Sequence, residues 1–304
     1  MRLCTRFFAA LIGVRDTEIG RLPVFACDSR RRIATRFGRE AKAVTFAVPH
    51  SRHIEFPDPT IDRMSQTVDI SIRPSNSLTS GELEEIWALT ERYVDTPRQH
   101  YESKLLALPE VGLWRARGGE LAGLVSLHVR PVVWEGRTRI IIFTSSVVAD
   151  ERFRGRNLVL KTGLRVFARE RLRRPFAPAY WFFDTFSYKS YLILARNLGE
   201  YWPRRDRSTP ADTLAFIDKL ATEQYGADWD RAAGIVRRSG HKQLRPDTAP
   251  IDDKLRSDPD VSFFETANPG HSEGDMLVCL APLTVRNFMG AIKRARRRPS
   301  AALG

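Results

Sequence analysis

One apolar run, residues 138–149, limits the architectures open to this chain more than any other stretch. Its sequence, TRIIIFTSSVVA, is rich in β-branched residues. It lacks the alternation of apolar and polar residues that marks a strand with one solvent-exposed face. Such a strand is buried on both faces, so we expect it in the middle of a sheet. A basic loop containing Gly155 follows it, and then a segment with helical periodicity.

The segments around this run predict strands and helices in a mixed order. Residues 68–73 alternate like a half-buried strand, and Thr79 or Ser80 can cap a helix whose first turn is acidic. The predicted fold class is therefore α/β (α+β), a mixed central sheet flanked by helices. The other expected segments are strands at 111–117, 120–133, 179–187 and 275–284, and helices at 98–108, 158–174, 188–199, 211–226 and 285–298.

The N-terminal part of the chain differs in kind from the rest. Residues 1–63 carry 12 Lys and Arg against 7 Asp and Glu with poor periodicity, which predicts a basic, poorly ordered extension. Clear patterns begin at Met64, so either Met64 is the true start or the extension is a targeting or nucleic-acid-binding arm. In the domain expected over 64–304, residues 226–274 are rich in Asp, Pro and Gly and predict a long, loosely structured insertion. A basic helix is expected at the C-terminus.

The charge and the cysteines narrow the classes of function. A formal net charge of +13 favours anionic partners: nucleic acid, acidic membranes or phosphorylated cofactors. The three cysteines are far apart and show no Cys-x-x-Cys spacing, which argues against a disulfide framework or a structural metal site and fits a reducing, cytoplasmic compartment. No apolar run approaches the roughly 20 residues that span a bilayer.

The loop at residues 152–157, RFRGRN, places a glycine and three arginines just ahead of a helix. A helix N-terminus offers unpaired N–H groups and partial positive charge, so a turn leading into it can cradle a pyrophosphate. Gly155 allows a close backbone approach or a positive φ, and Arg152, Arg154 and Arg156 attract phosphate. A plain strand-to-helix turn with three solvated arginines is the alternative.

At this loop the chain resembles the GCN5-related N-acetyltransferase (GNAT) superfamily. The signature of that family is Arg/Gln-x-x-Gly-x-Gly/Ala between its fourth strand and third helix, and RFRGRN stands in that place here. The resemblance covers about residues 68–200. It implies an acyl-CoA-dependent N-acyltransferase that uses acetyl-CoA or another acyl-CoA as co-substrate and no metal. The implied acceptor is an amine of a small molecule or a protein.

The same resemblance implies where coenzyme A would lie. The loop would hold the pyrophosphate, the edge of residues 147–149 would pair with the pantetheine amides as an added strand does, and residues 181–186 would splay away to admit the thioester. The implied cofactor-binding residues are Val147, Val148, Ala149, Arg152, Arg154, Gly155, Arg156, Asn157 and Leu158.

Two positions depart from the family pattern. Asn157 stands where Gly or Ala is usual; asparagine tolerates the left-handed conformation, but its side chain would crowd the phosphates. The tyrosine that often protonates the leaving thiolate in the family is replaced by Leu194 or Ala195. Tyr188 or Tyr191 could substitute, although tyrosines also serve as packing aromatics. A non-catalytic CoA-binding protein is therefore an alternative to an enzyme.

The attack of an amine on a thioester needs a base for the amine and a proton donor for the sulfur. Asp184 interrupts a strongly apolar strand, so its carboxylate must pair, face a cleft or have a raised pKa. Glu151 and His128 are further candidates for the base. We take Asp184 and Tyr188 as the candidate catalytic residues.

A basic nucleic-acid-binding protein is the main rival interpretation. Basic runs at 29–32 and 293–298 and the aromatic residues near 201–207 favour it. No helix-turn-helix, zinc-finger or RRM signature is present, and the basic runs lie near the ends of the chain.

Overall fold

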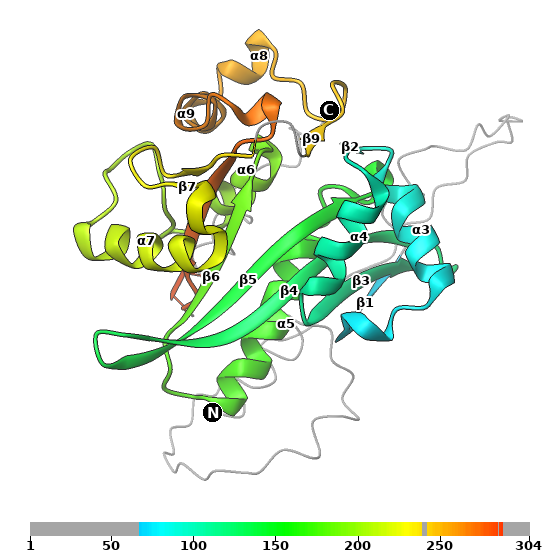
Figure 1. Ribbon diagram of the computed structural model, residues 1–304, viewed down its shortest axis with the longest axis horizontal. Coiled ribbons are helices and arrows are strands. Elements are labelled where there is room, and N and C mark those ends of the chain that lie inside the picture. The colour runs from blue at the N-terminus through cyan, green and yellow to red at the C-terminus, as the bar shows by residue number, and fades with distance from the viewer. Residues whose placement is uncertain (1–66, 239–241, 285, 288–304) are drawn as a thin grey trace, which may run out of the picture. The chain divides into compact units, whose positions relative to one another are not determined.

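The computed structural model describes residues 67–238, 242–284 and 286–287 (Figure 1). The extension predicted over 1–63 lies outside these residues, as does the helix predicted over 285–298 except for residues 286–287. Within the described part, eight strands form one sheet in the order β1-β3-β4-β5-β6-β10-β8-β7. β5 and β6 run parallel and their neighbours pair antiparallel, so the predicted mixed sheet flanked by helices is confirmed.

The element bounds agree with most of the expected segments. The strands of the sheet are β1 (Val68–Pro74), β3 (Glu110–Ala116), β4 (Leu121–Trp134), β5 (Arg137–Ala149), β6 (Ala179–Thr185), β7 (Trp229–Asp230), β8 (Ile235–Val236) and β10 (Met276–Pro282). A separate two-stranded pair consists of β2 (Val94–Asp95) and β9 (Gln243–Leu244). The α-helices are α3 (Ser80–Thr90), α4 (Arg98–Ala107), α5 (Leu158–Arg173), α6 (Tyr188–Asn197), α7 (Ala211–Tyr225), α8 (Asp253–Arg256) and α9 (Pro259–Ala267).

The start of α3 confirms the predicted cap. Thr79 has an extended backbone and its hydroxyl accepts a hydrogen bond from Glu82 N, while the Glu82 carboxylate accepts one from Thr79 N. This capping box satisfies two N–H groups that the helix itself leaves unpaired.

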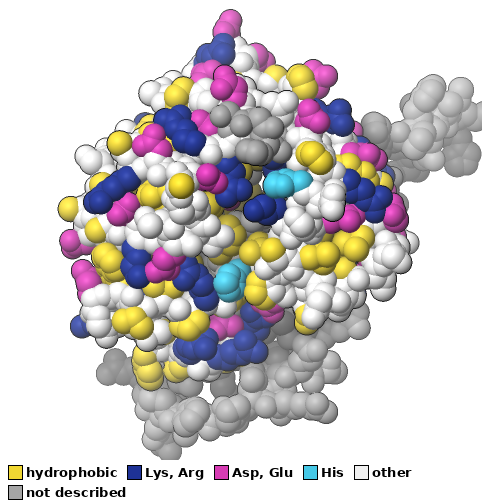
Figure 2. Space-filling view, viewed as in Figure 1, with side chains coloured by type: hydrophobic (Ala, Val, Ile, Leu, Met, Phe, Trp, Pro, Cys, Tyr) yellow, Lys and Arg dark blue, Asp and Glu magenta, His cyan; other side chains and the backbone are white. Residues whose placement is uncertain are grey.

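Two hydrophobic clusters lie on the same face of the sheet, which we call the front face. One joins Ile86 of α3 and Tyr101 of α4 to Val148 of β5, and the other joins Phe216 of α7 to Phe143 of β5. Figure 1 shows α3 and α4 over one half of this face, α7 over the other, and α5 on the opposite face. In Figure 2, Lys, Arg and His side chains gather between the two halves.

β5 is paired along one edge and open along part of the other. It pairs with β4 over most of its length, with an irregularity at Ser146, whose φ is 50°. It pairs with β6 from Ile140 to Thr144 only, ending opposite Phe183. Residues 145–149 therefore have no partner on the β6 side within the described sheet. The predicted splay of β6 begins at Asp184, whereas its residues 181–183 remain paired.

The prediction of a loosely structured insertion over residues 226–274 is wrong. β8 joins the main sheet beside β10, and β7 pairs with β8. β9 reaches across to β2, where Leu244 pairs with Val94. α9 packs on α6, with the Phe263 and Phe264 rings 5.8 and 5.9 Å from the Tyr191 ring. The described parts of the insertion, residues 226–238 and 242–274, thus contribute strands to the main sheet and core residues such as Val236 and Phe264.

Candidate functional site

The loop after β5 is braced by a buried carboxylate. Asp150 is 1% exposed and accepts hydrogen bonds from Arg152 N, Arg152 Nε and Arg92 Nη1, each at 2.9 Å. Hydrogen bonds from Arg152 and Arg92 hold the pKa of Asp150 well below its usual range, against the opposing effect of burial. We call these interactions of Asp150 with Arg152 and Arg92 the brace. The brace holds the short helical turn Glu151–Phe153 (η3), in which the Phe153 side chain is buried.

Arg152 belongs to this brace rather than to the open surface of the loop. Besides Asp150, its guanidinium donates to the Glu120 carboxylate, which comes from the turn before β4. Two carboxylates therefore compensate its charge. We accordingly remove Arg152 from the candidate phosphate ligands, although it holds the first position of the motif.

Gly155 and Asn157 have the backbone conformations that the sequence predicts. Gly155 has a φ of +79°, and a Cβ atom built there would meet nothing within 4 Å, so the loop surface at this point is open. Asn157 is left-handed, with φ 55° and ψ 36°, and caps α5. Its carbonyl accepts from Lys161 N, which leaves the N–H groups at 158–160 without an acceptor inside the helix. The unpaired N–H groups thus lie next to the open position at Gly155 in the chain.

Two arginines flank this open surface through aromatic contacts. The Arg154 guanidinium lies 4.6 Å from the Tyr93 ring centroid and its Nε donates to Ala149 O at 3.4 Å. The Arg156 guanidinium lies 5.1 Å from the Phe153 ring centroid. Stacking on an aromatic ring orients a planar guanidinium group. Arg154 is exposed and Arg156 half-buried.

The open edge of β5 leads directly into this loop. Val147 is 37% exposed, Val148 is buried in the cluster with α3 and α4, and Ala149 is half-buried. The backbone at 145–149 offers polar groups that an extended ligand could pair with. Beyond it lie the positive end of α5 and two stacked guanidinium groups, which suit an anion.

Asp184 stands where β5 and β6 part. It follows Phe183, the last residue of β6 that pairs with β5, and it shares the front face with Tyr180 and Phe182 because strand residues alternate. Burial raises the pKa of the Asp184 carboxyl, while Arg238 and Lys242 oppose this shift. It makes no ion pair with any residue that the structure describes.

The residues around Asp184 come from an unexpected part of the chain. Burial and then Asp184 raise the pKa of Tyr225, the last residue of α7. Burial lowers the pKa of Lys242, which Asp184 partly restores. Arg238 and Lys242 both belong to the insertion. The sequence does not predict that Arg238 and Lys242 lie near Asp184. The two-residue strands β8 and β9, which position these two residues, are too short to show periodicity.

The other candidates for a base are placed less favourably. His128 on β4 lies opposite Phe143 on the front face and is half-buried. Burial, and then Arg130, lower its pKa and favour neutral imidazole. Glu151 is exposed on the brace, where its N–H donates to the Tyr93 hydroxyl at 3.2 Å. Asp184 is therefore the carboxylate best placed at the splay.

The two tyrosines at the start of α6 have different surroundings. Tyr188 is the first residue of α6 and is 7% exposed, and its hydroxyl has no hydrogen-bond partner among the described residues. Burial, and then Asp252, raise its pKa, so the phenol keeps its proton. The Tyr191 hydroxyl donates to Pro203 O at 3.2 Å, and its ring packs in an aromatic group. Tyr191 is thus a packing residue, and Tyr188 remains a candidate proton donor.

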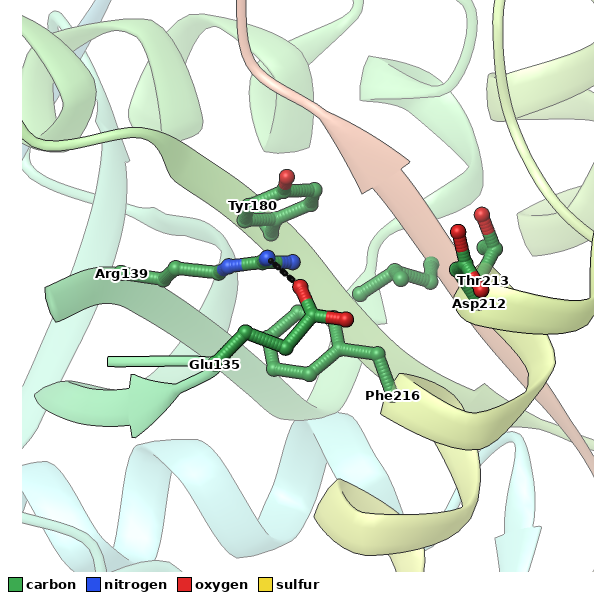
Figure 3. A pocket seen from close by; sticks show the side chains of 7 residues that line it. Glu135, Arg139, Tyr180, Asp212, Thr213 and Phe216 are labelled. Carbon is green, nitrogen blue, oxygen red and sulfur yellow. Dashed lines mark hydrogen bonds and ion pairs between the residues drawn. The ribbon is translucent and has the colours of Figure 1, made fainter. Parts of the chain in front are cut away.

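A small pocket of about 170 Å³ lies at the other end of β5 (Figure 3). The Arg139 guanidinium is held there by Glu135 at 2.8 Å and lies 4.9 Å from the Phe216 ring centroid. Asp212 of α7 also lines this pocket. The pocket is remote in sequence and register from the open edge, and it contributes no residue to the candidate site.

The described residues also bear on metal binding and membrane insertion. Over the described ranges, no cluster of three or more His, Cys, Asp or Glu side chains could hold a metal ion. None of the helices in those ranges has the length and apolar character needed to cross a bilayer.

Comparison with known proteins gives similarities of structure only. No family model matches the chain, and no curated protein matches its sequence. Among solved structures, the chain is similar in fold to a GNAT family N-acetyltransferase from Escherichia coli in complex with CoA, at 18% identity and a TM-score of 0.27 over 42% of this chain and 66% of that one. It is also similar to an acetyltransferase from Trypanosoma brucei, at 21% identity and a TM-score of 0.30 over 47% of this chain and 98% of that one. A third similarity is to a probable N-acyltransferase from Enterococcus faecalis, at 12% identity and a TM-score of 0.32 over 72% and 67%.

Proposed function

We propose that this protein is an acyl-CoA-dependent N-acyltransferase that binds coenzyme A along the open edge of β5. The observation that carries the proposal is the coincidence of three features at one point. β5 loses its parallel partner after Thr144, the following loop is left-handed and open at Gly155 and Asn157, and α5 begins there.

The residues at this point fit coenzyme A. The pantetheine arm is an extended chain with two amides, which can pair with residues 145–149 as an added strand does. The pyrophosphate would accept from the N–H groups at the start of α5 and contact Arg154 and Arg156. The open space at Gly155 admits the phosphates, and Asn157 takes the left-handed turn that its residue type tolerates.

The reaction proposed is direct transfer of an acyl group, acetyl in the first instance, to an amine. The amine nitrogen forms a bond to the thioester carbonyl carbon and the carbon–sulfur bond breaks. Asp184 accepts the proton that keeps the amine neutral, and Tyr188 donates a proton to the departing sulfur. The raised pKa of Asp184 makes it a stronger base than an exposed carboxylate, and the raised pKa of Tyr188 keeps it protonated. The proton lost by nitrogen thus balances the proton gained by sulfur.

The distribution of charge separates this proposal from nucleic-acid binding. Residues 64–285 contain 31 Lys and Arg against 29 Asp and Glu, so most of the net charge of +13 belongs to residues 1–63 and 286–304. Many arginines of the folded part are also paired with carboxylates. Nucleic-acid binding, if it occurs, would therefore be a property of the two ends and not of the site at β5.

The test is the thermal midpoint of the full-length protein with CoA, acetyl-CoA and longer acyl-CoAs. A ligand that binds the folded state raises the midpoint with its concentration. Gly155→Glu should abolish the shift, because it places bulk and negative charge in the open loop. Gly136→Glu is the matched control, since Gly136 also has a positive φ of +70° and open space but lies in the β4–β5 turn.

Three outcomes are informative. A concentration-dependent shift in the wild type and in Gly136→Glu, absent in Gly155→Glu, supports the proposal. No shift with any CoA, together with salt-sensitive DNA binding, contradicts it. A shift without turnover of any amine would favour a non-catalytic CoA-binding protein.

A further inference from the structure

Two cationic side chains act on Asp184, and one of them has no carboxylate partner among the described residues. Asp184 lies on β6, Arg238 follows β8 and Lys242 precedes β9. The Lys242 ammonium lies 5.7 Å from the Tyr101 ring centroid and 5.5 Å from the Phe186 ring centroid. It forms no ion pair with the part of the chain that the structure describes. The Arg238 guanidinium lies 3.6 Å from the Asp228 carboxylate, and Arg238 N donates to Asp275 Oδ1.

One buried donor in this group has no hydrogen-bond partner among the described residues, namely Arg238 Nε. The Arg238 guanidinium lies 5.8 Å from the Tyr225 ring centroid, and Tyr225, 8% exposed, has its hydroxyl beside Asp184. Buried donors are nearly always paired in a native protein, so Arg238 Nε and the Lys242 ammonium together point to a bound partner.

The position of the group makes the acyl acceptor the natural partner. Tyr101 comes from α4 and Tyr225 from α7, so the group lies on the front face between the two helix groups, where Figure 2 shows Lys and Arg side chains. Asp184 at its base is the residue where β6 leaves β5. An acceptor entering between α4 and α7 would meet Lys242 and Arg238 beside the carboxylate.

We propose that the acceptor is a small amine that also carries an anionic group, with Asp184 facing its nitrogen and Lys242 and Arg238 facing its anion. This inference rests on the proposed acyltransferase function. A polyamine or another purely cationic amine would bring positive charge against Arg238 and against Lys242, which has no ion pair with the described residues. An amine with a carboxylate or phosphate complements both signs, and the forked guanidinium suits either anion.

The test is calorimetric titration of full-length protein saturated with CoA. The ligands are ω-amino acids of two to six carbons, aminoalkyl phosphates of the same lengths, the corresponding amines without the anion, and 1,4-diaminobutane. We expect at least one anion-bearing amine to bind about tenfold or more tightly than the corresponding amine without the anion, a difference of about 1.4 kcal/mol. The carboxylate and phosphate series distinguish the two sources of the anion.

Variants connect this preference to the residues. Lys242→Met and Arg238→Gln should each reduce the preference at least fivefold, while Lys242→Arg keeps most of it. Lys254→Met is the matched control, because Lys254 is an exposed lysine of the same insertion, and it should leave the preference unchanged.

The possible failures are distinguishable. If CoA itself gives no binding signal, both the proposed function and this inference are contradicted. If CoA binds but every anionic ligand stays below tenfold preference, or Lys242→Met retains the preference, this inference alone is overturned.

Discussion

Two aspartates mark the ends of the gap between β5 and β6, and their surroundings are opposite. Asp150 directly follows β5 and accepts hydrogen bonds from two arginines, which hold its pKa well below the usual range. Asp184 lies on β6 at the start of the splay, makes no ion pair with the described residues, and has a pKa raised by burial. A carboxylate paired with arginines stabilises a fold, whereas a buried one without an ion pair retains the capacity to take a proton.

The two aspartates therefore have different roles at the gap between β5 and β6. Asp150 fixes the loop that is proposed to hold the pyrophosphate, and the edge of β5 before it is open because pairing with β6 stops at Thr144. Asp184 is left with cations that do not reach ion-pair distance, so its proton can move. The account therefore assigns stability to Asp150 and chemistry to Asp184.

The largest expected effect is on turnover in Asp184→Asn. The amide has nearly the shape of the carboxylate but accepts no proton, so the rate constant for acyl transfer should fall by about 10²–10⁴-fold. The thermal midpoint should stay the same or rise, because a poorly compensated buried charge is removed. Steady-state kinetics and thermal unfolding of the same preparation measure both. Retained turnover would remove Asp184 from the mechanism.

Tyr188→Phe should lower kcat by about 10²-fold with little change in KM or in the midpoint, since its hydroxyl makes no hydrogen bond to the described residues. Tyr191→Phe is the matched variant on the same helix. It loses the hydrogen bond to Pro203 O and should lose about 1 kcal/mol of stability while keeping kcat. Equal effects of the two variants on kcat would contradict a proton donor at Tyr188.

Asp150→Asn should act mainly on stability. It breaks the charge-assisted hydrogen bonds from Arg152 and Arg92, and we expect a loss of about 2 kcal/mol in the free energy of unfolding, limited because both guanidinium groups are about half exposed and can be rehydrated. Denaturant titration measures it. Turnover should fall only as far as CoA binding weakens, and a stability equal to wild type would refute the brace.

Acid should separate the two aspartates in opposite directions. The pKa of Asp150 is lowered on folding, so its contribution to stability is complete above the unfolded value of about 3.9 and is lost as pH falls through the folded value. The pKa of Asp184 is raised on folding, so its cost is complete above the folded value and disappears as pH falls to the unfolded one.

The variants should therefore respond to acid differently from the wild type. Between pH 7 and about pH 3, Asp150→Asn should lose less stability than wild type and Asp184→Asn should lose more. Thermal midpoints across this range provide the measurement. A common pH profile for the three proteins would show that folding shifts the pKa of neither carboxylate, which contradicts both assignments.

Local signals predicted the loop well and its partners poorly. The apolar run before Asp150, the positive φ at Gly155 and the left-handed Asn157 follow from residue type and order. The engagement of Arg152 by Glu120, 32 residues away, does not, because an arginine in a loop carries no sign of which carboxylate will meet it.

The surroundings of Asp184 were still less accessible to the sequence. The strand pattern identified Asp184 as an anomaly but gave no means of finding Lys242 or Arg238. Those residues reach it through β7, β8 and β9, two-residue strands stabilised by tertiary pairing rather than by local propensity. The edge of β5 is open where its pairing with β6 stops. The periodicity of apolar residues does not predict that point.

The most direct test of the central claim is amide hydrogen exchange of the full-length protein with and without CoA. The account predicts new protection at residues 145–149 and 155–160, with little change at residues 140–144, whose pairing with β6 already protects them. Protection confined to other parts of the chain, or none at saturating CoA, would contradict the claim that coenzyme A binds along the open edge of β5.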